Sequence, residues 1–170
     1  MKRILLLVTV ALLLAGAMAL SGVAQAKPIS TKADAQCAKL AIKTLGPSVN
    51  PANYTFIGGT EGNDAFDSQA TSGNDVFCGF GGHDRIGIFE VTGTLDQGDI
   101  FLGGAGGDSV LARNEGTFYG GDGDDSVDTN YGTFYGEAGN DSVVANGGTF
   151  NGGADTDSVT TNTGIIDSVP

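Results

Sequence analysis

Single apolar residues recur at a fixed spacing along the second half of the chain, each set among glycines and small polar residues. They form two interleaved series in which successive members lie 16 or 17 residues apart. The first series is Val110, Val127, Val143 and Val159, and the second is Phe118, Phe134, Phe150 and Ile166. Because side chains alternate between the two faces of a strand, each series predicts one inner wall of a thin core.

Two kinds of turn separate these apolar positions. One is rich in glycine and ends on an aspartate; it begins at Gly103, Gly120, Gly136 and Gly152. The other reads Asn-x-Gly; it begins at Asn114, Asn130, Asn146 and Asn162. Two turns per period, repeated at constant spacing, are typical of a solenoid with two short strands in each coil. Residues 50–170 are therefore expected to be all-β: a parallel β-roll or β-helix solenoid with about 16–18 residues per coil.

A different periodicity precedes the repeats. Apolar residues between Thr31 and Leu45 recur at helical spacing, Thr31-Lys32-Ala33-Asp34 matches an acidic form of the capping box, and Gly46-Pro47 ends the pattern. We expect a short helix within residues 27–49 that caps the first coil, since the end coils of solenoids expose apolar surface. The alternative is that this segment has no ordered structure.

Residues 1–26 have the pattern of a secretory signal peptide. Met1-Lys2-Arg3 is basic, residues 4–20 are apolar, and Ala24-Gln25-Ala26 matches a cleavage site between small side chains. We therefore expect a secreted, extracellular protein. The apolar stretch is also close to the length that spans a bilayer, so a retained membrane anchor is the alternative. No second long apolar segment follows, and we expect no membrane insertion after cleavage.

Charge is distributed very unevenly. Of the 20 acidic residues, all but Asp34 lie in residues 50–170, where Arg85 and Arg113 are the basic residues. Nineteen acids against two arginines give this region a net charge of −17. Nucleic acid is excluded as a partner, because its binding needs basic patches. So acidic a region either stays disordered by self-repulsion or folds around cations.

The remaining reactive residues are few. Cys37 and Cys78 are the two cysteines; in an exported chain they predict one disulfide bond, and two free thiols are the alternative. His83 is the single histidine and occupies the variable fifth place of a turn. A nucleophile–histidine pair is therefore not expected, and neither is catalysis.

The glycine-rich turns resemble a known calcium-binding repeat. Gly120–Asp128 reads GGDGDDSVD and Gly103–Leu111 reads GGAGGDSVL. Both match the nonapeptide G-G-x-G-x-D-x-U-x of the repeats-in-toxin (haemolysin-type) family, where U is a bulky apolar residue. Gly136–Val144 lacks only the second glycine, and looser copies extend the resemblance to about residues 57–160. It implies a parallel β-roll with several Ca2+ ions between neighbouring turns, held by aspartate carboxylates and turn carbonyl oxygens.

On this resemblance, Asp64, Asp84, Asp108, Asp125, Asp141 and Asp157 would bind metal on one edge of the roll, and Asp75 and Asp99 would lie on the other. Three features depart from the family. The other edge carries Asn-x-Gly from Arg113 onward, which predicts an asparagine ladder there. Asp155 replaces a turn glycine, which puts the last site in doubt. The insert Ile88–Gly93 is expected to break the metal row.

Solvated acidic turns without metal, or Mg2+, are the alternatives to Ca2+; Zn2+ is disfavoured because the ligands are oxygens. The leading hypothesis is a secreted calcium-binding β-roll module that folds as Ca2+ binds and has no catalytic activity of its own. Two other interpretations stay open. One is an adhesin or a surface-layer component that binds polysaccharide or ice, or associates with itself, through a face carrying Thr117, Thr133 and Thr149. The other is an accessory module of a polysaccharide-modifying enzyme.

Overall fold

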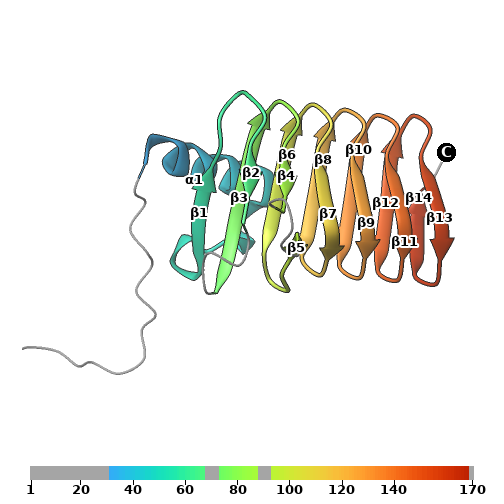
Figure 1. Cartoon of the computed structure of the whole chain (residues 1–170). Coiled ribbons are helices and arrows are strands. Elements are labelled where there is room, and N and C mark those ends of the chain that lie inside the picture. The colour runs from blue at the N-terminus through green and yellow to red at the C-terminus, as the bar shows by residue number, and fades with distance from the viewer. Residues whose placement is uncertain (1–30, 68–72, 88–92, 169–170) are drawn as a thin grey trace, which may run out of the picture.

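Two parallel β-sheets face each other across a narrow core in the computed structural model, which describes residues 31–67, 73–87 and 93–168 (Figure 1). The chain passes alternately from one sheet to the other, so successive coils stack their strands in parallel. The predicted all-β solenoid is therefore confirmed. The expected signal peptide, residues 1–26, lies outside the described residues.

The two sheets take their strands in chain order. The first sheet contains β1 (Tyr54–Gly58), β3 (Asn74–Gly81), β6 (Ile100–Ala105), β8 (Thr117–Asp122), β10 (Thr133–Ala138), β12 (Thr149–Ala154) and β14 (Ile165–Ser168). The second sheet contains β2 (Ala65–Phe66), β4 (Arg85–Ile86), β7 (Ser109–Asn114), β9 (Ser126–Asn130), β11 (Ser142–Asn146) and β13 (Ser158–Asn162), with β5 (Thr94–Leu95) paired beside β7.

The register confirms the predicted repeat in the later coils. Val110 lies beside Val127, and Phe118 lies beside Phe134, so equivalent residues are 17 or 16 positions apart. The first coils are longer than expected, because Arg85 lies beside Ser109, 24 positions on. The extra residues of these coils include 68–72 and 88–92, which lie outside the described residues.

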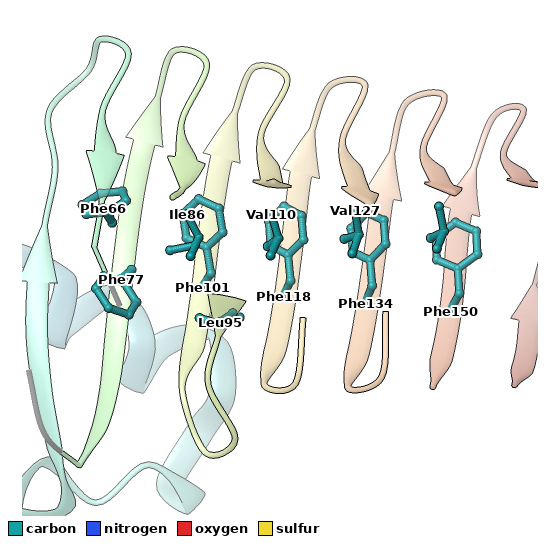
Figure 2. Close-up of a cluster of buried hydrophobic side chains, with 11 residues drawn as sticks. Phe66, Phe77, Ile86, Leu95, Phe101, Val110, Phe118, Val127, Phe134 and Phe150 are labelled. Carbon is teal, nitrogen blue, oxygen red and sulfur yellow. The ribbon is translucent and has the colours of Figure 1, made fainter. Parts of the chain in front are cut away.

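The core between the sheets contains a stack of phenylalanine rings that face smaller aliphatic side chains (Figure 2). Phe101, Phe118, Phe134 and Phe150 are fully buried, and their ring centroids are 4.8, 4.8 and 5.1 Å apart in succession. Each stacked pair contributes about 0.5–1.5 kcal/mol beyond the burial of its area. The predicted valine wall faces this stack. Ile166 takes the next place beside Phe150 but remains 40% exposed, because it lies on the last described strand.

The predicted helix is also present. Helix α1 (Lys32–Leu45) begins at Thr31, whose hydroxyl accepts the N–H of Asp34, while the Asp34 carboxylate accepts the N–H of Thr31. It ends at Gly46, whose φ of 72° is a left-handed conformation that glycine adopts without steric cost. Two short 3-10 turns, η1 (Gly46–Ser48) and η2 (Pro51–Asn53), lead into β1.

Helix α1 covers the first strands in two ways (Figure 1). Asp34 accepts the N–H of Gly58 at 3.1 Å and so satisfies one donor of the edge strand β1. The buried face of the helix packs on the outward side of the first sheet, in a second core separate from the phenylalanine stack; it contains Cys37, Ala38, Ala41, Val49, Phe56, Val76, Cys78 and Leu102. The predicted disulfide between Cys37 and Cys78 is confirmed and holds this second core together.

Within the described residues, no helix is long and apolar enough to cross a membrane.

Candidate metal site: a ladder of buried aspartates

The aspartates that end the glycine-rich turns lie in one row along an edge of the solenoid. Each stands directly before a strand of the second sheet, and its side chain turns into the coil instead of toward solvent. Asp84, Asp108, Asp125 and Asp141 are each 1% exposed, and Asp157 is 7% exposed. Asp64 begins the row and is half-buried. The structure therefore brings together all six residues predicted for this edge.

Each carboxylate in the row bonds to the backbone of the preceding coil. The N–H of one aspartate donates to Oδ1 of the aspartate in the next coil, and this repeats without interruption. The distances are 2.7 Å for Asp64 to Asp84, 2.7 Å for Asp84 to Asp108, 2.6 Å for Asp108 to Asp125, 2.8 Å for Asp125 to Asp141 and 2.9 Å for Asp141 to Asp157. We call this row the aspartate ladder.

The sequence put two places of the ladder in doubt, and the ladder hydrogen bonds are present at both. The expected break between Asp84 and Asp108 is wrong: the insert follows β4, beyond the turn, and leaves the stacking of the turns unchanged. Asp155 does not displace Asp157 either, because it adopts a φ of 75°, the left-handed conformation of the glycine it replaces. Its neighbour therefore keeps its place in the ladder.

In five of the six carboxylates the second oxygen is buried and has no hydrogen-bond partner, namely Oδ2 of Asp84, Asp108, Asp125, Asp141 and Asp157. The exception is Asp64, whose Oδ2 accepts from the N–H and the hydroxyl of Thr60. Each Oδ2 points at the first glycine of its own turn. A methyl group built on Gly120 would overlap Oδ2 of Asp125 and would lie 2.8 Å from the carbonyl oxygen of Gly136 in the next coil. A carboxylate oxygen and a carbonyl oxygen thus converge on one small space, which only glycine leaves open.

Burial makes these carboxyl groups weak acids. Desolvation, together with the charge of the neighbouring carboxylates, raises the pKa of Asp125 to about 8, that of Asp108 to about 7 and that of Asp141 to about 6. The backbone hydrogen bonds act in the opposite direction but are outweighed. Desolvation likewise raises the pKa of Asp84, which His83 lowers only in part. The negative charge of the ladder is therefore poorly compensated by the protein itself.

The opposite edge is held by amides, as predicted. Nδ2 of each asparagine donates to Oδ1 of the asparagine in the next coil at 2.8 Å, which links Asn114, Asn130, Asn146 and Asn162. Asp75 and Asp99 precede this asparagine ladder on the same edge, where the N–H of Asp75 donates to Oδ1 of Asp99 at 2.9 Å. Both aspartates are buried. They lie apart from the six aspartates of the ladder.

The donor set at the aspartate ladder suits a hard cation. Its side-chain atoms are carboxylate oxygens, and carbonyl oxygens lie beside them. Among the described residues, no three His, Cys, Asp or Glu side chains converge on one point. An ion between two coils would therefore draw on backbone carbonyls as well as carboxylates, which is the oxygen-rich ligand set that Ca2+ prefers.

Sequence reasoning missed one part of this arrangement. The first glycine of each turn accommodates Oδ2, a role that spacing alone does not reveal. It also missed that Phe80 and Glu137 take left-handed conformations at the second place of their turns, with φ of 75° and 78°. The available signal was their departure from glycine within the repeat.

No family model, no curated protein and no solved structure matches this chain.

Proposed function

We propose that this protein is a secreted, non-catalytic calcium-binding solenoid, stabilised by Ca2+ ions held between successive coils along the aspartate ladder. The observation that carries the proposal is the row of five Oδ2 atoms that are buried without a partner. A buried polar atom without a partner is costly, and a buried charge is more costly still. A divalent cation would compensate both at once.

Asp84, Asp108, Asp125, Asp141 and Asp157 would supply the carboxylates, with Asp64 at the first coil. Asp75 and Asp99 would form at most a separate, shorter site on the other edge. Ca2+ is favoured over Mg2+ because it accepts irregular sets of six to eight oxygens, whereas Mg2+ demands an octahedron and retains water. Binding would be weak per site, with Kd on the order of 10^-4 to 10^-3 M, as in extracellular modules.

The test compares two variants of equal charge. Asp125→Asn keeps the shape of the side chain and its acceptor for the N–H of Asp108, but it removes the charge from the ladder. Asp128→Asn removes the same charge from an exposed site on the following strand. Thermal unfolding of the purified chain is followed by far-UV circular dichroism while Ca2+ is raised, and calorimetry gives the affinity.

A concentration of Ca2+ ten times Kd should stabilise the wild-type chain by about 1.4 kcal/mol per site. Asp128→Asn should respond equally, whereas Asp125→Asn should lose part of the response and be at least as stable as the wild type without metal. An unchanged unfolding temperature at millimolar Ca2+, or equal losses in the two variants, would refute binding at the ladder.

A second candidate function rests on the outward face of the first sheet. Thr117, Thr133 and Thr149 lie in register there, and the rings of Tyr119 and Tyr135 stack with centroids 4.9 Å apart. A regular face of hydroxyl groups and aromatic rings is compatible with adhesion to polysaccharide or ice. Retention of the purified chain on cell-wall polysaccharide or in growing ice would support it, and retention unchanged in Thr133→Val would exclude the threonines.

A further inference from the structure

We propose that a groove between the C-terminal end of α1 and the outward face of the first sheet binds a lysine or arginine side chain of a partner polypeptide. The groove consists of two adjoining hollows of about 220 and 390 Å3. Thr44, Tyr119 and Glu137 line both hollows and therefore mark the boundary between them. We call this region the α1 groove; the turn glycines Gly103 and Gly120 line its smaller hollow, but the ladder carboxylates, which lie inside the coils, do not.

The walls of the α1 groove combine apolar side chains with polar groups. Leu40 and Leu102 line the smaller hollow, and Leu45, Tyr54 and Ile100 line the larger one. These side chains belong to the second core or pack against it, so their positions are fixed by the helix and the sheet. The methylene groups of a long basic side chain could pack along such walls while its charged end stays near polar groups.

The charged side chains that line the groove are both negative. The carboxylates of Asp122 and Glu137 line the smaller hollow, and Glu137 also reaches the larger one. The last carbonyl groups of α1 add partial negative charge, which Lys43 in the same turn opposes. Among the described residues, the one ion pair is Arg113 with Glu115, away from this groove. Burial, together with the nearby Asp122, raises the pKa of Glu137, as expected for a carboxylate without a positive partner.

The backbone of Glu137 is strained. Its φ of 78° lies in the left-handed region, while its register neighbours Gly121 and Gly153 are glycines. A side chain in this conformation brings Cβ too close to the following carbonyl oxygen. Such strain tends to occur where a side chain has a function. Here the strained residue is also one of the three that line both hollows, and it is the only one of the three that carries a charge.

These observations together select the ligand. Two carboxylates disfavour an anion, and the apolar side chains of the walls favour an organic cation over a hydrated metal ion. The aromatic ring of Tyr119 adds a surface on which a guanidinium or ammonium group can rest. Both hollows are open to solvent along the surface, so an extended polypeptide can lie across them and insert one basic side chain.

The experiment must separate this site from the general attraction of an acidic protein for cations. Glu137→Gly removes one negative charge and the strain, and Asp155→Gly does the same at a left-handed residue outside the groove. The probe is the peptide acetyl-Gly-Gly-Lys-Gly-Gly-amide, with a glutamine version as its neutral counterpart. Binding to the full chain is measured by NMR titration, with and without Ca2+.

The lysine peptide should bind the wild type and Asp155→Gly alike, and about tenfold more weakly to Glu137→Gly, as expected for the loss of one charge-assisted hydrogen bond. The glutamine peptide should bind none of them measurably. Equal weakening in both variants, or no difference between the two peptides, would overturn the proposal. Binding of the lysine peptide that is the same with and without Ca2+ would support a groove that acts independently of metal at the aspartate ladder. The two proposals can then fail separately.

Discussion

At the scale of single residues, the first glycine of each turn decides whether the ladder can form. A methyl group on Gly120 would overlap Oδ2 of Asp125, while one on Gly62 would meet its nearest neighbour at an ordinary 3.7 Å. We expect Gly120→Ala to lower the free energy of unfolding by about 3 kcal/mol, in the range of overpacked core sites, and Gly62→Ala to change it by less than about 0.5 kcal/mol. Urea unfolding of the two variants checks this; equal stabilities would show that the turn relaxes freely.

A second residue-scale prediction concerns Glu137. Replacing it by glycine should raise the free energy of unfolding by about 1 kcal/mol, because glycine adopts φ of 78° without steric cost. The variant Glu137→Ala is the matched control, since it removes the carboxylate but keeps the strained Cβ. If alanine stabilised the chain as much as glycine, charge repulsion with Asp122 would be the cause instead of strain.

The positions of the ladder residues could be predicted from the sequence, but their interactions could not. Spacing alone placed Asp84, Asp108 and Asp125 on one edge. It did not show that Oδ1 accepts a backbone N–H from the preceding coil, because that bond depends on how coils are staggered in space. The conformation of Glu137 could not be predicted either. Most turns have glycine at this place, and the sequence does not show whether a different residue there keeps the same φ.

At the scale of elements, the two edges use different ways to stack coils. An asparagine both donates and accepts, so Asn130 can accept from Asn114 and donate to Asn146. An ionised aspartate only accepts, so its ladder must alternate with backbone N–H groups. The amide edge therefore leaves only its first acceptor, Oδ1 of Asn114, buried without a partner, while the carboxylate edge leaves one oxygen of each aspartate from Asp84 to Asp157 without one.

Asn130→Asp tests this difference. The carboxylate would lose the donor to Asn146 and would face the carbonyl oxygen of Thr149, which Nδ2 now contacts at 2.9 Å. We expect a loss of about 3–5 kcal/mol near neutral pH, as for a buried charge without a partner, and partial recovery in acid when the group can donate. Asn63→Asp is the control, because Asn63 is exposed and its Oδ1 accepts the N–H of His83. Urea midpoints at pH 4 and 7.5 that do not differ between the variants would contradict the prediction.

The disulfide between Cys37 and Cys78 supports the helix against the first sheet. The bridge joins residues 41 positions apart, a loop for which chain-entropy arguments give a stabilisation of about 4 kcal/mol. The double variant Cys37→Ala with Cys78→Ala should lose this amount and should release α1 before the later coils unfold. Hydrogen exchange of the helix amides, compared with those of β10, would show this; equal protection in both would mean that the helix docks without the bridge.

Sequence patterns predicted the elements better than their packing. The helix begins and ends where the capping box and Gly46 indicated, and the disulfide pairs as expected. The packing of α1 on the outward face of β1, β3 and β6 was not predicted, since that face reads only as scattered apolar residues such as Phe56 and Leu102. The α1 groove follows from this packing and could not be found from the sequence.

At the scale of the whole molecule, the stability of the solenoid depends on the charge of the aspartate ladder. The phenylalanine stack and the asparagine ladder do not titrate, so they stabilise the fold equally at all pH values of interest. The aspartates do titrate, with pKa values raised from 3.8 to about 6 for Asp141, about 7 for Asp108 and about 8 for Asp125. The folded chain therefore binds more protons than the unfolded chain between about pH 4 and 8.

This proton binding fixes the sign of the pH dependence. Without Ca2+, the free energy of unfolding should be highest near pH 4 and should fall as the pH rises from 4 to 8, because over this range the folded state keeps protons that the unfolded state has already lost. Ca2+ binds the ionised form, so it should restore stability most strongly near pH 8. In Asp125→Asn, both the loss of unfolding free energy with rising pH and its recovery on addition of Ca2+ should be smaller. Urea midpoints measured from pH 4.5 to 8.5, with and without Ca2+, test this directly. A midpoint that rises with pH in calcium-free buffer would mean that the carboxylates are already compensated in the folded chain, and would remove the physical reason for metal at the ladder.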